Sequence, residues 1–67
     1  MTAKELEKIV KADGWYFVRQ CGSHRQYKNH GKKGMVTIPF HAKPKDINII
    51  TLGRIFKQAQ LKMDDYV

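Results

Sequence analysis

Residues 15–28 read WYFVRQCGSHRQYK and contain two strand-like runs on either side of a glycine. The first run, Trp15–Cys21, is rich in aromatic and β-branched residues, which favour strands. Gly22-Ser23 supplies the small polar residues of a tight turn, and the polar residues that follow alternate around Tyr27. The stretch therefore predicts a β-hairpin around which the rest of the chain is organised.

Regular alternation divides the hairpin's side chains between two faces. The better core face of the first strand comprises Trp15, Phe17 and Cys21, with Arg19 reaching out at its edge. On the return strand Tyr27 is the natural inward residue, so His24 should point away from the core together with Gln26 and Lys28. We therefore expect His24 to be exposed.

The residues before the hairpin predict a helix over Ala3–Ala12. Thr2 and Glu5 fit a capping box, and Leu6 and Val10 repeat at helical spacing. Asp13-Gly14 then ends the helix, because glycine accepts the left-handed conformation that closes a helix.

The residues after the hairpin predict a third strand and a second helix. The strand is Met35–Phe40, and Pro39 should place it at a sheet edge, since proline lacks an amide hydrogen. Residues 46–50 are apolar enough to dock on the core through three isoleucines, and Thr51 is the expected cap of the second helix. The inward stripe of that helix is Leu52, Ile55, Phe56 and Ala59.

The predicted order is helix, three strands, helix, in one domain over residues 1–67. Both amphipathic helices can cover the single apolar face of an antiparallel sheet, which makes this an α+β fold with a wet opposite face. Near the C-terminus, Met63 begins one expected helical turn, and Tyr66 is expected to pack back on the core.

Composition limits the partners and the compartment. Thirteen Lys and Arg residues against six Asp and Glu give a net charge of +7 and a pI of about 9.8, which favours a polyanionic partner such as RNA. One cysteine cannot form an internal disulfide, in keeping with a reducing cytoplasm. No apolar run approaches the ~20 residues of a membrane span, so we expect no membrane partner.

Residues 22–28 carry the clearest chemistry. They place His24, which can exchange protons near neutral pH, beside a hydroxyl and several cations that can hold a phosphate. The alternative interpretation is an exposed histidine of a small basic domain without catalytic duty. A metal site formed by Cys21, His24, His30 and His41 matches no standard zinc spacing, and Cys21 has no evident activating partner as a nucleophile. We therefore expect no metal and no cofactor.

The chain resembles the HicA toxin family, small messenger-RNA interferases of type II toxin–antitoxin systems. The matching motifs are Gly14-Trp15, Arg19-Gln20, Gly22-Ser23-His24, Tyr27, Thr37-Ile38-Pro39-x-His41, Thr51-Leu52 and Ile55-Phe56-Lys57-Gln58-Ala59. The resemblance implies a double-stranded-RNA-binding-domain-like fold, with a three-stranded antiparallel sheet and two helices on one face. It also implies RNA cleavage with His24 as catalytic residue, and inhibition by a HicB-like antitoxin that covers the active face. We expect a monomer alone and a hetero-oligomer with the antitoxin.

Proximity to the Gly-Ser-His motif and basic character suggest further residues that hold RNA phosphates. They are Ser23, Arg19, Arg25, Lys28, Lys32, Lys33, His41 and Lys43. Two other functions stay open: a non-catalytic RNA-binding module of the same fold, and a protein-interaction domain with an acidic partner. The first would bind RNA in a salt-sensitive way without cleaving it, and the second would do neither.

Overall fold

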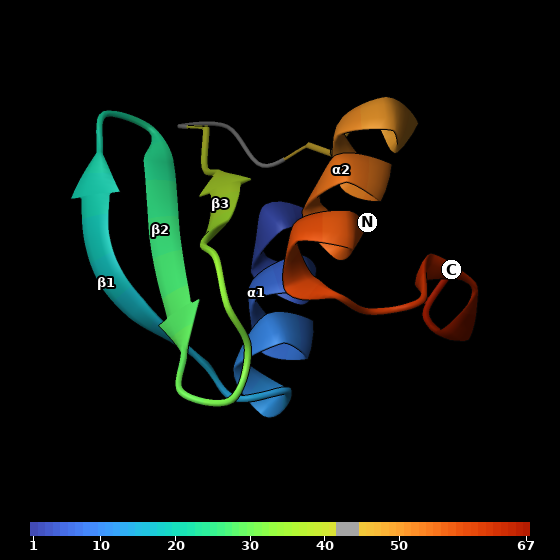
Figure 1. Cartoon of the computed structure of the whole chain (residues 1–67). Helices are drawn as coiled ribbons and strands as arrows, with labels where there is room; N and C mark the ends of the chain where they lie inside the picture. Colours follow the sequence, from blue (N-terminus) through green and yellow to red (C-terminus); the bar gives the residue numbers. More distant parts are fainter. Residues whose placement is uncertain (42–44) are drawn as a thin grey trace.

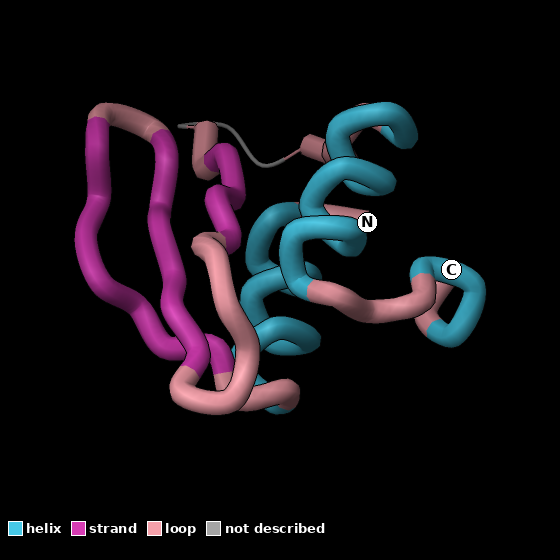
Figure 2. The backbone as a smooth tube through the Cα atoms, in the orientation of Figure 1, coloured by secondary structure: helices cyan, strands magenta, loops and turns pink. Residues whose placement is uncertain are grey.

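Two helices lie against one face of a three-stranded antiparallel sheet, and β1 lies farthest from them (Figures 1 and 2). The computed structural model describes residues 1–41 and 45–67. The elements are α1 (Ala3–Ala12), β1 (Trp15–Cys21), β2 (His24–Asn29), β3 (Val36–Pro39), α2 (Ile49–Ala59) and the short 3₁₀ helix η1 (Met63–Asp65). The sheet order is β1-β2-β3, so β2 is the central strand. The predicted α+β class and element order are confirmed.

The start of α1 has the predicted capping box. The amide of Glu5 donates to Oγ1 of Thr2 at 3.2 Å, and the amide of Thr2 donates to Oε1 of Glu5 at 3.0 Å. These reciprocal bonds satisfy two amides that a helix start otherwise leaves without partners. At the other end Gly14 has a φ of +99°, which turns the chain into β1.

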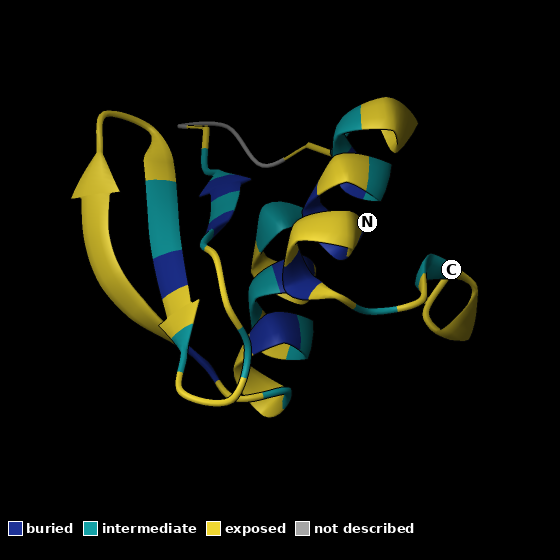
Figure 3. Ribbon diagram, in the orientation of Figure 1, coloured by how far each residue is buried: buried dark blue, intermediate teal, exposed yellow. Residues whose placement is uncertain are grey.

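The core lies between the helices and the β2–β3 part of the sheet (Figure 3). Its buried side chains come from every main element, and the predicted inner stripe of α2 is confirmed. The members are Leu6, Val10, Trp15, Tyr27, Val36, Ile38, Leu52, Ile55, Phe56 and Ala59. After α2, the ring of Tyr66 stacks on Phe56 with centroids 5.5 Å apart, as expected for a tail that packs back.

The predicted core face of β1 is wrong at Cys21, and Phe17 lies on that face without being buried. Trp15 is buried, but Phe17 is 47% exposed and Cys21 is exposed. A β-bulge explains Cys21: Phe17 pairs with Tyr27 and Arg19 pairs with Gln26, so Val18 is an extra residue and the residues after it change face. Phe17 lies before the bulge, and it is exposed because the core lies under the other two strands, so only the beginning of β1 reaches it.

β3 is shorter than predicted, because it begins at Val36 and ends at Pro39. Its position at a sheet edge, predicted from Pro39, is confirmed. The side chain of Gln58 on α2 covers part of this edge, where its Oε1 accepts the Thr37 amide at 3.0 Å. The free edge of β3 is thereby tied to the helix layer.

α2 begins earlier than predicted, and its cap is Asn48 rather than Thr51. Oδ1 of Asn48 accepts the amide of Ile50 at 2.8 Å, so the two isoleucines belong to the first helical turn. Ile49 and Ile50 are 59% and 66% exposed, which corrects the expectation that they dock on the core. Only Ile47, just before the cap, packs against the core.

Candidate functional site

The side of the sheet opposite the helices is called the open face here. Strand pairing fixes its members, because residues directly opposite each other on neighbouring strands share a face. They are Tyr16, Arg19 and Cys21 from β1, His24, Gln26 and Lys28 from β2, and Thr37 and Pro39 from β3. None of these residues carries a carboxylate.

His24 is the first residue of the central strand, and it is exposed on the open face. It lies opposite Cys21 on one side and Pro39 on the other. The turn before it depends on Gly22, whose φ of +61° is left-handed. The carbonyl of Ser23 accepts the amide of Phe40 at 2.6 Å, which fastens this turn to the end of β3. The backbone of His24 is therefore held from both sides while its side chain faces solvent.

The bulge at Val18 brings Arg19 onto the open face. Uninterrupted alternation from Trp15 would have turned Arg19 towards the helices, whereas its pairing with Gln26 places it two residue pairs from His24, at the next position on the same face. Nε of Arg19 donates to Oε1 of Gln26, which holds the guanidinium over the sheet. Lys28 is exposed at the far end of the same face. Two predicted phosphate-binding residues thus share a surface with His24.

The positive charge of the chain is concentrated around this sheet. Residues 14–45 contain seven Lys and Arg residues and no Asp or Glu. The remaining residues carry six charges of each sign, so the whole net charge of +7 belongs to this one segment. This uneven distribution along the chain favours polyanion binding by the segment, in which Arg19, Lys28 and Lys33 are exposed.

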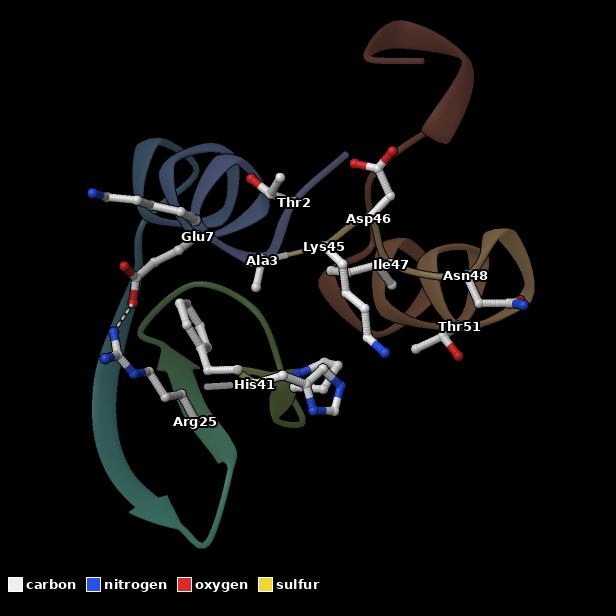
Figure 4. A pocket seen from close by; sticks show the side chains of 13 residues that line it. Thr2, Ala3, Glu7, Arg25, His41, Lys45, Asp46, Ile47, Asn48 and Thr51 are labelled. Atoms are coloured by element: carbon white, nitrogen blue, oxygen red, sulfur yellow. Dashed lines mark hydrogen bonds and ion pairs between the residues drawn. The ribbon is translucent and has the colours of Figure 1, made fainter. Parts of the chain in front are cut away.

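Arg25 points to the helix side. Its Nη1 lies 3.2 Å from Oε2 of Glu7, and its guanidinium carbon lies 4.0 Å from the centre of the Phe40 ring (Figure 4). Tyr27 donates its hydroxyl hydrogen to the same carboxylate. Burial, and then this hydrogen bond, raise the pKa of Tyr27. Arg25 therefore joins β2 to α1 and does not share a surface with His24.

Lys32 also has structural partners. Its Nζ lies 2.7 Å from Oδ2 of Asp13 and donates to the carbonyls of Ala59 and Gln60 at 3.1 and 3.2 Å. Its neighbour Lys33 is exposed in the same loop. The predicted phosphate-binding residue Lys43 lies outside the described residues.

A cleft of about 750 Å³ opens on the helix side, between the first turns of α1 and α2 and the end of β3 (Figure 4). Arg25, His41 and Lys45 line it, along with Glu7 and Asp46. It is the larger of the two best-formed hollows of the described residues, but it is not on the His24 surface. His41 thus follows β3 into the cleft instead of joining the open face.

Sequence reasoning missed an aromatic pair on the open face. The rings of Tyr16 and His30 stack with centroids 4.8 Å apart and planes 26° apart. Tyr16 is opposite Lys28, and His30 comes from the loop after β2. The sequence did contain a signal for the position of Tyr16. Tyr16 directly follows Trp15 in a strand, so its side chain should point to the opposite face and into solvent.

Two absences in the described ranges, residues 1–41 and 45–67, bear on the alternatives. No three His, Cys, Asp or Glu side chains there gather in a way that could hold a metal ion, so the residues of the considered metal site are not brought together. Within the same ranges, no helix has the length and apolar character needed to cross a bilayer.

These observations define a small α+β domain whose one sheet face is covered by helices and whose other face is open, cationic and bears an exposed histidine. The family of HicA toxins of bacterial toxin–antitoxin systems matches residues 3–61, and the chain belongs to this family. It is therefore a toxin of a toxin–antitoxin system, in a family of messenger-RNA-cleaving toxins, and membership implies an antitoxin partner. No curated protein sequence matches the chain.

Proposed function

We propose that the protein cleaves messenger RNA on the open face, with His24 as general acid or base. The observation that carries the proposal is the position of His24: an exposed imidazole on a rigidly held strand start, on a face without carboxylates. A carboxylate there would repel RNA phosphates, whereas the surrounding segment carries the entire net positive charge. Membership in a family of messenger-RNA-cleaving toxins supports the same reaction.

The reaction requires three things of the site. The 2′-hydroxyl must lose its proton, its oxygen must lie in line with the phosphorus, and the charge on the phosphorane must be stabilised. His24 accepts the 2′-hydroxyl proton or donates a proton to the departing 5′-oxygen, and water carries the other proton. The scissile phosphate then ends as a cyclic phosphate on the ribose.

The helper residues are those that share the open face or its turn. Arg19 is the best-placed cation for the phosphate at His24, because it lies two residue pairs away on the same face and its guanidinium can bind two phosphate oxygens. Lys28 holds the strand further along, and Lys33 extends the cationic surface into the loop. Ser23, in the turn before His24, is a hydrogen-bond donor to the same phosphate.

We further propose that no metal takes part and that the toxin acts in the cytoplasm, where its messenger RNA substrate lies. The imidazole supplies the proton transfer, and the guanidinium supplies the charge stabilisation that a divalent ion provides in other nucleases. The exposed thiol of Cys21 would stay reduced in that compartment. An antitoxin of complementary acidic charge fits the cationic surface.

The test compares wild type, His24→Ala and His41→Ala on single-stranded RNA with chelator present. His41→Ala is the matched variant, because His41 is also an exposed histidine but lines the cleft. Wild type and His41→Ala should cleave, and His24→Ala should be at least about 10²-fold slower, the lower end of general acid–base effects. A substrate with 2′-deoxyribose at the cut position should resist cleavage.

Three results would count against the proposal. Equal cleavage by wild type and His24→Ala would remove His24 from the chemistry. Salt-sensitive binding without cleavage by wild type would identify an RNA-binding module instead. Activity that disappears with chelator and returns with a divalent metal would remove the metal-independent mechanism. Circular dichroism of each variant ensures that lost activity is not lost folding.

A further inference from the structure

The Tyr16–His30 pair is placed where a nucleic acid strand on the open face would pass. Tyr16 lies on the open face opposite Lys28, and His30 stacks on its ring at 4.8 Å. The Tyr16 side chain is 42% exposed, and His30 is exposed as well. Both side chains are therefore accessible to a ligand, and Lys28 supplies a cation beside them.

The distance along the sheet connects this pair with His24. Lys28 is four residues beyond His24 on β2, which is roughly 13 Å at the rise of an extended strand. An RNA strand that has one phosphate at His24 and follows β2 would bring a base a few nucleotides away over Tyr16. Aromatic side chains beside cations are how proteins hold single-stranded nucleic acids.

We propose, on the basis of the function proposed above, that Tyr16 and His30 form a stacking platform for one base of the RNA substrate. The base lies on the exposed aromatic surface, while Lys28 contacts the phosphate next to it. Every base has a π-face, so the platform positions the strand and does not by itself select a sequence. It makes Tyr16 a positioning residue for cleavage at His24.

Three substitutions separate stacking from packing. Tyr16→Phe keeps the ring, Tyr16→Leu keeps apolar bulk without a π-face, and Tyr16→Ala removes both. Tyr66→Ala is the matched control, because Tyr66 has a similar exposure of 44% and stacks on Phe56 away from the open face. All variants carry His24→Ala as well, so that the RNA stays intact while it is bound.

The probe is a short single-stranded RNA with 2-aminopurine at successive positions, because stacking quenches the fluorescence of this base. One position should be quenched on binding by the parent protein and by Tyr16→Phe. The quenching should be lost with Tyr16→Ala and Tyr16→Leu, and affinity should fall about 5- to 100-fold, as for other stacking aromatics. An abasic residue at that position should erase the difference between parent and Tyr16→Ala.

Other results would overturn the stacking platform. Tyr16→Leu binding and quenching like the parent would show that Tyr16 only packs, and equal affinity for Tyr16→Ala would remove the platform. Tyr66→Ala weakening binding as much as Tyr16→Ala would assign the effect to stability. Cleavage by the His24-containing protein is measured in parallel. Its absence overturns the proposed function, whereas normal cleavage without quenching at any position overturns only the platform.

Discussion

The ammonium of Lys32 lies 2.7 Å from Oδ2 of Asp13 and thereby joins the end of α1 to the loop after β2. The same ammonium reaches the last carbonyls of α2, at Ala59 and Gln60. A cation at a helix C-terminus satisfies carbonyls that have no helical partner and is favoured by the helix dipole. One loop side chain therefore holds both helices at the same end of the molecule.

Replacing Lys32 should weaken folding more than RNA binding. Lys32→Ala should lower the free energy of unfolding by about 1–3 kcal/mol, because it removes charge-assisted hydrogen bonds at a partly buried site. Lys33→Ala, the neighbouring control, should change stability by less than about 0.5 kcal/mol. Urea denaturation measures both, and equal stabilities would show that the Lys32 contacts contribute nothing.

Replacing Arg19 should weaken RNA binding more than folding. Arg19→Ala should reduce RNA affinity and lower the slope of log K against log salt by about 0.7, the value of one phosphate contact on a single strand. Arg54→Ala, an exposed arginine on α2, should leave the slope unchanged. The binding titrations use the His24→Ala background at several salt concentrations. An unchanged slope with Arg19→Ala would place Arg19 away from the RNA.

Deleting Val18 should be tolerated by the fold. The pairings on either side of the bulge, Phe17 with Tyr27 and Arg19 with Gln26, become consecutive when the extra residue is removed. Arg19 then stays on the open face, and the unfolding free energy should change by roughly 1 kcal/mol or less. Deleting Gln20 instead would take Cys21 out of register with His24 and displace the turn that Ser23 ties to β3, so that variant should be clearly less stable. Similar losses for both deletions in urea denaturation would contradict the bulge.

The phenol of Tyr27 should resist ionisation. Burial, followed by the hydrogen bond to Glu7, raises its pKa above the ordinary value of about 10. Because the pKa of Tyr27 is higher in the folded state, the neutral phenol contributes its full stabilisation at every pH below the pKa of Tyr27 in the unfolded chain. The contribution is lost as the pH rises above about 10 towards the folded pKa, because the unfolded chain gives up this proton first.

Ultraviolet titration checks this directly. A late ionisation step should belong to Tyr27, and Tyr27→Phe should remove it. The fall in wild-type stability above pH 10 should also be steeper than that of Tyr27→Phe. A titration curve of Tyr27→Phe that retains the late step, with the fold intact by circular dichroism, would show that the Glu7 contact does not hold the proton.

The sequence predicted those parts of the fold that depend on local chemistry. The capping box of α1, the inward stripe of α2 and the edge position of Pro39 each follow from neighbouring residues, and all three are confirmed. The predicted start of α2 was wrong because Asn48 and Thr51 are both good caps, and the helix uses Asn48, whose side chain accepts the Ile50 amide. The exposure of His24 was predictable because β2 alternates without interruption.

The rest of the candidate site depends on contacts between distant residues. Arg19 reaches the open face only because of a bulge, and no residue type marks a bulge in a sequence without glycine at that point. The partners of Arg25 and Lys32 are 18 and 19 residues away in the chain, so their structural roles were not visible in the motif around them. The catalytic role of His24 stays a prediction.

The bulge at Val18 also bears on how the toxin behaves at high concentration. β1 is an edge strand, and Tyr16, Phe17 and Val18 are three consecutive exposed apolar residues on it. A straight edge of this composition is a template for strand addition by a second copy and for aggregation. The bulge bends the strand in the middle and breaks the regular row of free amides and carbonyls. The irregularity that orients Arg19 thus also makes this edge a poorer template for strand addition.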